Sequence, residues 1–214
     1  LGPDERMRLR LPLAGRHNIS NALAALAAAS VWEVGAAEAR EVFPKLEATG
    51  MRGRVLQYDA GFTVINDCYN SNPVALAAMT GLLTNTPAKG RHILAAGEML
   101  ELGPTSADLH REAGRGAAAS GKLAWIIGVQ GDAESLVRGA VEAGHPAEQA
   151  KFFETSAEAA AFLAALVAPG DVLLVKGSRG VKMERIVETL DARFTRAQAE
   201  PAAPALSGTP KERA

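Results

Sequence analysis

Two hydrophobic periods alternate along most of this chain and predict strands followed by helices. Continuous apolar runs at 93–96, 124–127 and 172–175 are typical of strands that helices cover on both faces. The intervening segments repeat apolar residues at helical spacing. The predicted order is a hairpin of strands 54–58 and 62–67, helix 73–84, strand 91–96, helix 105–119, strand 124–128, helix 132–143, strand 151–154, helix 156–167, strand 171–175 and helix 181–194. This order predicts an α/β fold, a Rossmann-like and mostly parallel sheet with helices on both faces and right-handed crossovers.

The residues before this unit have a different pattern, which predicts a small α-rich piece. Leu and Met alternate with Arg over residues 6–13, as in a half-exposed strand. A helix is predicted from Asn18, and a second one over 36–43 that ends at Pro44. Gly50 and Gly53 indicate a linker over 45–53. Residues 197–214 are rich in Ala and Pro without any periodicity, which predicts a disordered tail.

Composition and charge exclude several classes of function. The 214 residues carry a net charge of −1, which argues against a nucleic-acid binder. No apolar run approaches the ~20 residues that a membrane helix needs, and no leader peptide is recognisable. The single cysteine, Cys68, rules out an internal disulfide and is consistent with a cytoplasmic protein. Because the chain opens on Leu1, we expect it to be part of a longer protein.

The segment 67–73 places small polar residues at the carboxyl end of a predicted strand, directly before a helix. Open α/β sheets bind their ligands at this position. Asn72 is a plausible N-cap and Pro73 suits the first helical turn, so a capped turn without a ligand is the simpler alternative. Cys68 is expected to be a buried thiol without a catalytic role.

A second strand end carries charged residues. Lys176, Ser178 and Arg179, with two glycines, follow the last apolar strand, and this composition predicts an anion site. The alternative is an ordinary basic turn. In the loop 97–103, Glu98 and Glu101 precede His110, which is consistent with a metal or acid–base site or simply with solvated acids at a helix entry.

Four segments together resemble the Mur ligases, ATP-dependent enzymes that add amino acids to the peptidoglycan precursor. They are GRHNISN at 15–21, DCYNSNP at 67–73, GEMLELG at 97–103 and KGSRG at 176–180. The resemblance runs from about residue 9 to about residue 195 and covers only the second half of such an enzyme. It implies that 1–48 ends the central ATP-binding domain and that 49–196 is the C-terminal domain. The 97–103 loop favours the branch that adds D-alanyl-D-alanine to UDP-N-acetylmuramoyl-tripeptide.

The resemblance also implies roles for individual residues. Asn21 is similar to an adenine contact, and His17 and Asn18 line the nucleotide pocket, although Asn18 alone could be a helix N-cap. Asp67 is expected to contact the ribose, and Tyr69, Asn70 and Asn72 shape the same lip. Arg54 is a candidate for the ATP phosphates, unless it is an ordinary edge-strand cation.

On the acceptor side, Lys176, Ser178 or Arg179 is expected to bind the carboxylate of the dipeptide. Arg54 and Lys176 are the expected catalytic residues. ATP and Mg²⁺ are the implied cofactors, with most magnesium ligands outside this chain and no metal ligand assigned within it. The small-molecule substrates are the expected partners of a monomer.

One motif is misleading, and other functions remain open. Residues 116–122 match the start of a phosphate-binding loop, but Leu123 replaces the Ser or Thr that reaches magnesium. The segment also ends a predicted helix, whereas a phosphate cradle opens one. The isolated chain is therefore expected to be inactive. Another Mur-type ligase, a folylpolyglutamate synthetase and a non-catalytic Rossmann-like binding module are the alternatives.

Overall fold

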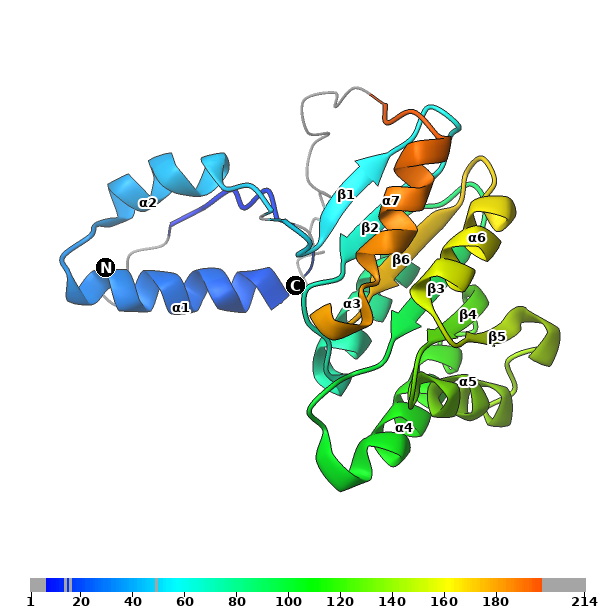
Figure 1. Ribbon diagram of the computed structural model, residues 1–214. Coiled ribbons are helices and arrows are strands. Elements are labelled where there is room, and N and C mark those ends of the chain that lie inside the picture. Colours follow the sequence, from blue (N-terminus) through cyan, green and yellow to red (C-terminus); the bar gives the residue numbers. More distant parts are fainter. Residues whose placement is uncertain (1–6, 14, 16, 49, 198–214) are drawn as a thin grey trace, which may run out of the picture.

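A six-stranded sheet organises the protein in the computed structural model, which describes residues 7–13, 15, 17–48 and 50–197 (Figure 1). The strands lie in the order β1-β2-β6-β3-β4-β5, and only β1 is antiparallel to its neighbour. Their bounds are β1 Arg54–Gln57, β2 Thr63–Asp67, β3 His92–Gly97, β4 Leu123–Val129, β5 Ala150–Phe153 and β6 Val172–Lys176. The α/β fold and the mostly parallel sheet that the sequence predicted are confirmed.

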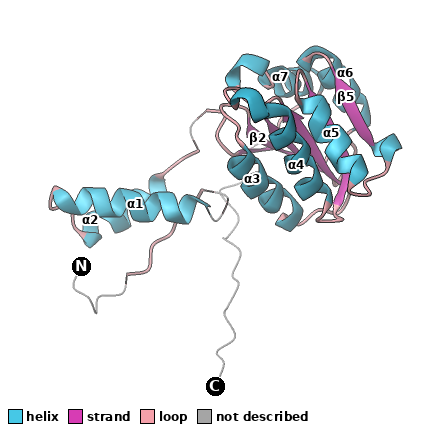
Figure 2. Ribbon diagram, turned by 90° about the horizontal axis from the view of Figure 1, so that it is seen from below, coloured by secondary structure: helices cyan, strands magenta, loops and turns pink. Residues whose placement is uncertain are grey.

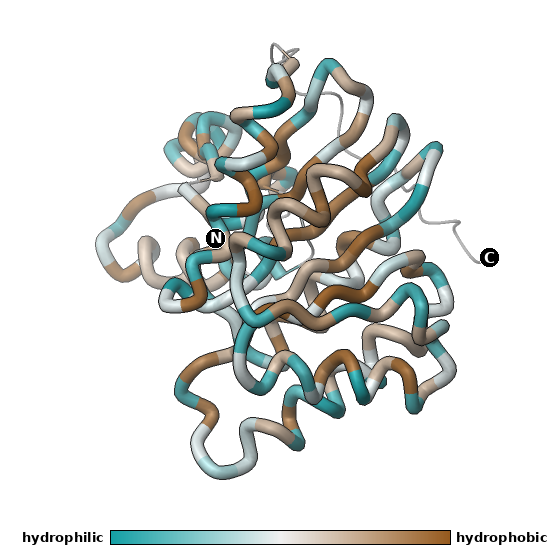
Figure 3. Tube along the Cα trace, turned by 45° about the vertical axis from the view of Figure 1, so that its right-hand side comes forward, coloured by the Kyte–Doolittle hydropathy of each residue, from teal (hydrophilic) through white to brown (hydrophobic). Residues whose placement is uncertain are grey.

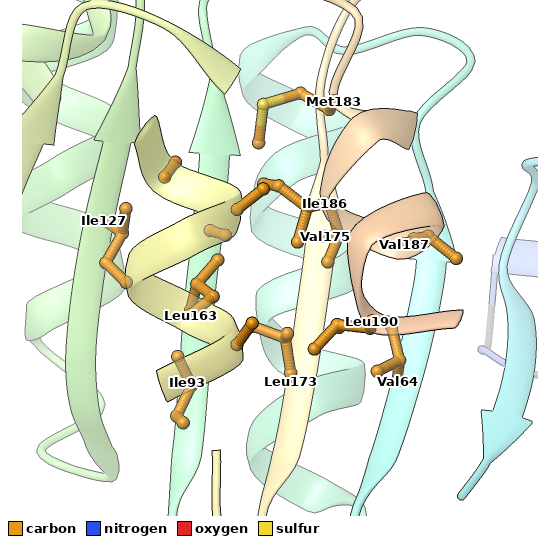
Figure 4. Packing of buried hydrophobic residues seen from close by; sticks show 14 of the residues in the cluster. Val64, Ile93, Ile127, Leu163, Leu173, Val175, Met183, Ile186, Val187 and Leu190 are labelled. Carbon is orange, nitrogen blue, oxygen red and sulfur yellow. The ribbon is translucent and has the colours of Figure 1, made fainter. Parts of the chain in front are cut away.

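Helices cover both faces of this sheet, so that the strands lie between two helical layers (Figure 2). One layer contains α3 Pro73–Asn85, α4 Ser106–Ala118 and α5 Ala133–Glu142, and the other contains α6 Ser156–Leu166 and α7 Glu184–Arg193. Figure 4 shows the second layer, where Leu163 of α6 and Leu190 of α7 lie over Leu173 of β6. Hydrophobic stretches run through the interior of this unit and hydrophilic residues gather in the outer loops (Figure 3).

Helices α4 and α5 approach each other closely because two glycines face each other's backbone. A Cβ atom placed on Gly114 would lie 1.9 Å from the Leu136 carbonyl oxygen, and one on Gly139 would lie 2.0 Å from the Arg111 carbonyl oxygen. Gly116, in the same helix as Gly114, has no atom within 4 Å of such a position. The two buried glycines therefore set the distance between α4 and α5.

The residues before the sheet form two helices and a short 3-10 turn. They are α1 His17–Val31, α2 Ala36–Val42 and Phe43–Lys45. Helix α1 buries none of its side chains, and Ile19 and Leu23 on its predicted apolar face are 56% and 62% exposed. Both predicted helices are confirmed. No helix among the described residues is long and apolar enough to cross a membrane.

The strand predicted over residues 6–13 is wrong, because residues 7–13 form no strand. Alternation of Leu or Met with Arg produces a strand only where a neighbouring strand supplies hydrogen bonds, and no described strand pairs with this segment. Residues 198–214, most of the predicted tail, lie outside the described residues. Ala197 donates its N–H to the Gln57 carbonyl at 2.9 Å, so the chain is still paired with β1 at that point.

Candidate active site at the carboxyl ends of the strands

The ends of β2 and β6 meet in a buried ion pair. Asp67 and Lys176 are register partners in these adjacent parallel strands. Lys176 Nζ lies 2.6 Å from Asp67 Oδ2 and donates a second hydrogen bond to the Asn70 carbonyl at 2.8 Å. The Lys176 side chain is 2% exposed and the Asp67 side chain is 16% exposed. Lys176 therefore neutralises Asp67 and also fixes the loop that follows β2.

The rest of the 67–73 loop is held by local hydrogen bonds. Asn70 Oδ1 accepts the Ser71 N–H at 2.9 Å. Asn72 Oδ1 accepts the Ala75 N–H at 2.8 Å, which confirms Asn72 as the N-cap of α3. Cys68 is fully buried, and burial raises the pKa of its thiol. The thiol is thus kept protonated and away from solvent, and the expectation that Cys68 is buried is confirmed.

Tyr69 is the part of this loop that reaches the surface, with 38% of the residue exposed. Two guanidinium groups lie against its ring. Arg52 Cζ is 4.0 Å from the ring centroid and Arg179 Cζ is 5.7 Å from it. Sequence reasoning named Tyr69 and Arg179 but missed Arg52, whose only signal was a cation between two glycines in the linker.

The 97–103 loop is tied to both neighbouring strand ends. The Leu100 N–H donates to the buried Ser178 Oγ at 3.1 Å. His110 is fully buried, and its Nε2 accepts the Met99 N–H at 2.8 Å while Nδ1 lies 2.8 Å from the Ser106 carbonyl. These two contacts require the neutral ring with the proton on Nδ1. His110 therefore positions the loop and has no free nitrogen for acid–base chemistry.

Glu98 is engaged in the same way, because its Oε1 accepts the Asp132 N–H at 3.1 Å. Within the described parts of the chain, no group of three or more His, Cys, Asp or Glu side chains could hold a metal ion. These hydrogen bonds favour a structural role for Glu98 and His110 over the metal or acid–base site that was one alternative for this loop.

The other candidate residues lie on separate elements. His17, Asn18 and Asn21 are in the first turns of α1, where Asn21 Nδ2 donates to Asn18 Oδ1 at 3.1 Å. Arg54 lies on β1 opposite Asn66. Burial would raise the pKa of Asp191, but hydrogen bonds from Arg196 and Tyr58 and the charges of Arg196 and Arg54 lower it. Arg54 thus acts on the α7 side of the sheet.

Comparison with known proteins identifies the family. Residues 51–179 match the family model described as Mur ligase, glutamate ligase domain. The chain belongs to the Mur ligase family. This match covers the linker arginine Arg52, the whole 67–73 loop and the β6 end as far as Arg179.

Two named relatives indicate which members of the Mur ligase family this chain is similar to. The chain is 31% identical over 188 residues to the UDP-N-acetylmuramoyl-tripeptide–D-alanyl-D-alanine ligase of Bacillus subtilis, which covers 84% of this chain and 39% of that protein. It is 33% identical over 198 residues to the Escherichia coli protein of the same name, with 90% and 41% covered. The chain therefore spans about two fifths of the length of these curated relatives.

Solved structures agree with this placement. MurF from Acinetobacter baumannii is 31% identical and superimposes with a TM-score of 0.76 over 88% of this chain and 40% of that one. MurF ligase from Thermotoga maritima, in a complex with ADP, is 25% identical with a TM-score of 0.58, over 70% of this chain and 32% of that one. The observed fold is thus that of the corresponding part of these Mur ligases.

The phosphate-loop match at 116–122 is misleading in this chain, as the sequence predicted. Helix α4 ends at Ala118 and β4 begins at Leu123, so the segment closes a helix and precedes a strand. Gly121 adopts a φ of 62°, which suits the turn after α4. The backbone N–H groups of a helix start, which a phosphate cradle needs, are not present there.

Proposed function

We propose that this chain is the C-terminal part of an ATP-dependent ligase that joins D-alanyl-D-alanine to UDP-N-acetylmuramoyl-tripeptide through an acyl phosphate. The observation that carries the proposal is the meeting of the 67–73 and 176–180 segments at the Asp67–Lys176 contact. Relatives similar over both segments bear the name of this ligase. The ends of parallel strands are also where open α/β sheets bind ligands.

Amide formation from an acyl phosphate requires mainly positioning and charge stabilisation. We assign the nucleotide side to His17, Asn18, Asn21, Asp67, Tyr69, Asn70 and Asn72, and the phosphates to Arg54. Lys176 fixes the backbone of the 67–73 loop. Asp67 Oδ1 accepts no hydrogen bond from a described residue, and we assign it to a ribose hydroxyl. Because no described cluster could hold a metal, we assign the Mg²⁺ ligands mainly to the phosphates and to the part of the relatives that this chain does not cover.

The dipeptide side is assigned to Lys176, Ser178 and Arg179, and their exposure separates their roles. Lys176 and Ser178 are buried and already hydrogen-bonded within the protein. Arg179 is exposed and has no described ion pair. We therefore propose that Lys176 and Ser178 shape the site and that Arg179 touches the substrate carboxylate.

The test is phosphate release by a protein extended at its N-terminus to the length of the relatives. It is supplied with ATP, magnesium and UDP-N-acetylmuramoyl-tripeptide, with and without D-alanyl-D-alanine. Release that requires the dipeptide supports the proposal. If release instead requires another amino acid, or glutamate together with a folate, the chain belongs to another branch. If no acceptor causes release, the binding-module alternative remains. The 214-residue chain alone is expected to give no turnover.

A further inference from the structure

We propose that Arg52 and Arg179 form an oxyanion clamp stacked on Tyr69, a site in which the linker supplies one of the two guanidinium groups. The clamp rests on the proposed function. The oxyanion is either the terminal carboxylate of the dipeptide or a phosphoryl group bound on the nucleotide side of the site. Arg52 is the new component.

The geometry brings the two cations to one aromatic ring. Arg52 Cζ lies 4.0 Å and Arg179 Cζ lies 5.7 Å from the same ring centroid, so they cannot be farther apart than the sum of these distances. A guanidinium held over a ring face keeps its N–H edge free. That edge binds a carboxylate or a phosphate through two parallel hydrogen bonds.

Among the described residues, neither arginine has a counter-ion. Five of the described arginines are paired with carboxylates, namely Arg91, Arg111, Arg115, Arg138 and Arg196, whereas others on the surface, such as Arg193, are not. Arg52 and Arg179 form no ion pair with any described residue. Asp67, the carboxylate at the end of β2 and two residues before Tyr69, is already paired with Lys176. Two like charges that share an exposed ring therefore favour an anion from outside the protein.

The clamp also joins two segments that are remote in sequence. Arg52 lies between Gly50 and Gly53, whose φ angles of 57° and 71° are in the left-handed region. Glycine adopts this region without strain, so the linker can rotate on either side of Arg52. Arg179 belongs to the turn after β6. An oxyanion held by both side chains would fix the linker against the sheet.

The test uses the 214-residue chain with ¹⁵N-labelled arginine, and it follows the side-chain Nε–H resonances. The probes are D-alanyl-D-alanine, D-alanyl-D-alaninamide, which lacks the carboxylate, and inorganic phosphate, each titrated through the millimolar range. We expect the Arg52 and Arg179 resonances to shift together, with a single Kd, for the dipeptide or for phosphate. Binding of the dipeptide but not its amide identifies a carboxylate, whereas a phosphate-only response identifies a phosphoryl group.

Variants make the assignment specific. Arg52→Ala is expected to weaken binding about tenfold, the effect of losing one charge-assisted hydrogen-bond pair. Arg52→Lys keeps the charge and is expected to restore only part of the affinity that Arg52→Ala loses. Arg193→Ala is the matched control, because Arg193 is exposed and lies 5.4 Å from the Phe194 ring. It is expected to leave the Kd unchanged.

Any of three results overturns the clamp. The first two are an Arg52 resonance that responds to neither oxyanion, and an Arg52→Ala Kd within about twofold of the original. Equal shifts for dipeptide and amide, without a phosphate response, would also show that no oxyanion is recognised. The titration contains neither ATP nor UDP-N-acetylmuramoyl-tripeptide, so its failure leaves the ligase proposal to its own turnover assay.

Discussion

Replacing Lys176 by methionine is expected to destabilise the protein strongly, because it leaves a buried carboxylate without its partner. Methionine matches the length of the lysine stem but carries no charge or donor. In the wild-type protein, Nζ is 2.6 Å from Asp67 Oδ2 and 2.8 Å from the Asn70 carbonyl. Both contacts lie where water has little access, since the lysine side chain is 2% exposed.

The magnitude follows from two opposing energies. At an effective dielectric constant of about 20, unit charges about 3 Å apart attract by roughly 5 kcal/mol. Desolvation of both ions offsets most of this gain, so the intact pair contributes little net stability. Removing only the cation keeps the cost of the buried anion, and breaking such a pair costs about 3–5 kcal/mol. Asp67→Asn with Lys176→Met removes both charges, and we expect it to regain at least half of the loss.

Urea unfolding followed by far-UV circular dichroism measures all four corners of this double-mutant cycle. Lys151→Met is the control, because Lys151 is exposed and 5.8 Å from the Phe162 ring. It should change the free energy of unfolding by no more than about 0.5 kcal/mol. A loss below about 1 kcal/mol in Lys176→Met, or strictly additive single effects, would refute the reasoning.

Two further predictions concern packing and pH. Gly114→Ala should lower the free energy of unfolding by about 1–3 kcal/mol, because its Cβ would overlap the Leu136 carbonyl, whereas Gly116→Ala should raise it by up to about 1 kcal/mol. Thermal melts with the opposite order would contradict this. Burial would raise the pKa of Asp171, but hydrogen bonds from the Arg91 side chain and backbone N–H groups lower it. The stabilisation of the folded state by Asp171 is complete above the pKa of the unfolded chain, about 4, and is lost as pH falls through the lower folded pKa. The urea midpoint of Asp171→Asn should therefore decline less in acid, and parallel curves would count against the assignment.

Much of the α/β architecture could be predicted because local patterns determine it. The apolar runs of β3, β4 and β6 identify strands that are covered on both faces, and the cap at Asn72 was readable from the residue types alone. The strand order was not readable. Placing β6 between β2 and β3 depends on how side chains from distant segments pack. Residues 7–13 were predicted wrongly because alternation does not show whether a pairing strand exists.

The candidate site also has some features that the sequence predicts and others that depend on tertiary contacts. Asp67 and Lys176 were both named from their positions at strand ends, but their contact depends on the β2–β6 register. Arg52 was missed because its role depends on the position of the Tyr69 ring, and a linker arginine has no periodic signature. His110 was recognised as a candidate, yet only its two hydrogen bonds show that the ring supports the Met99 backbone.

The central position of β6 constrains how the chain folds during synthesis. Strands β2 and β3 are made early but are not neighbours, and β6, which lies between them, is the last of the described strands in chain order. Until it arrives, both strands present unpaired edges, which are the kind of surface that promotes aggregation. Lys176 is 109 residues from Asp67, so the candidate active site cannot exist on a nascent chain that lacks its final strand. Assembly of the site therefore reports that the whole sheet has been completed.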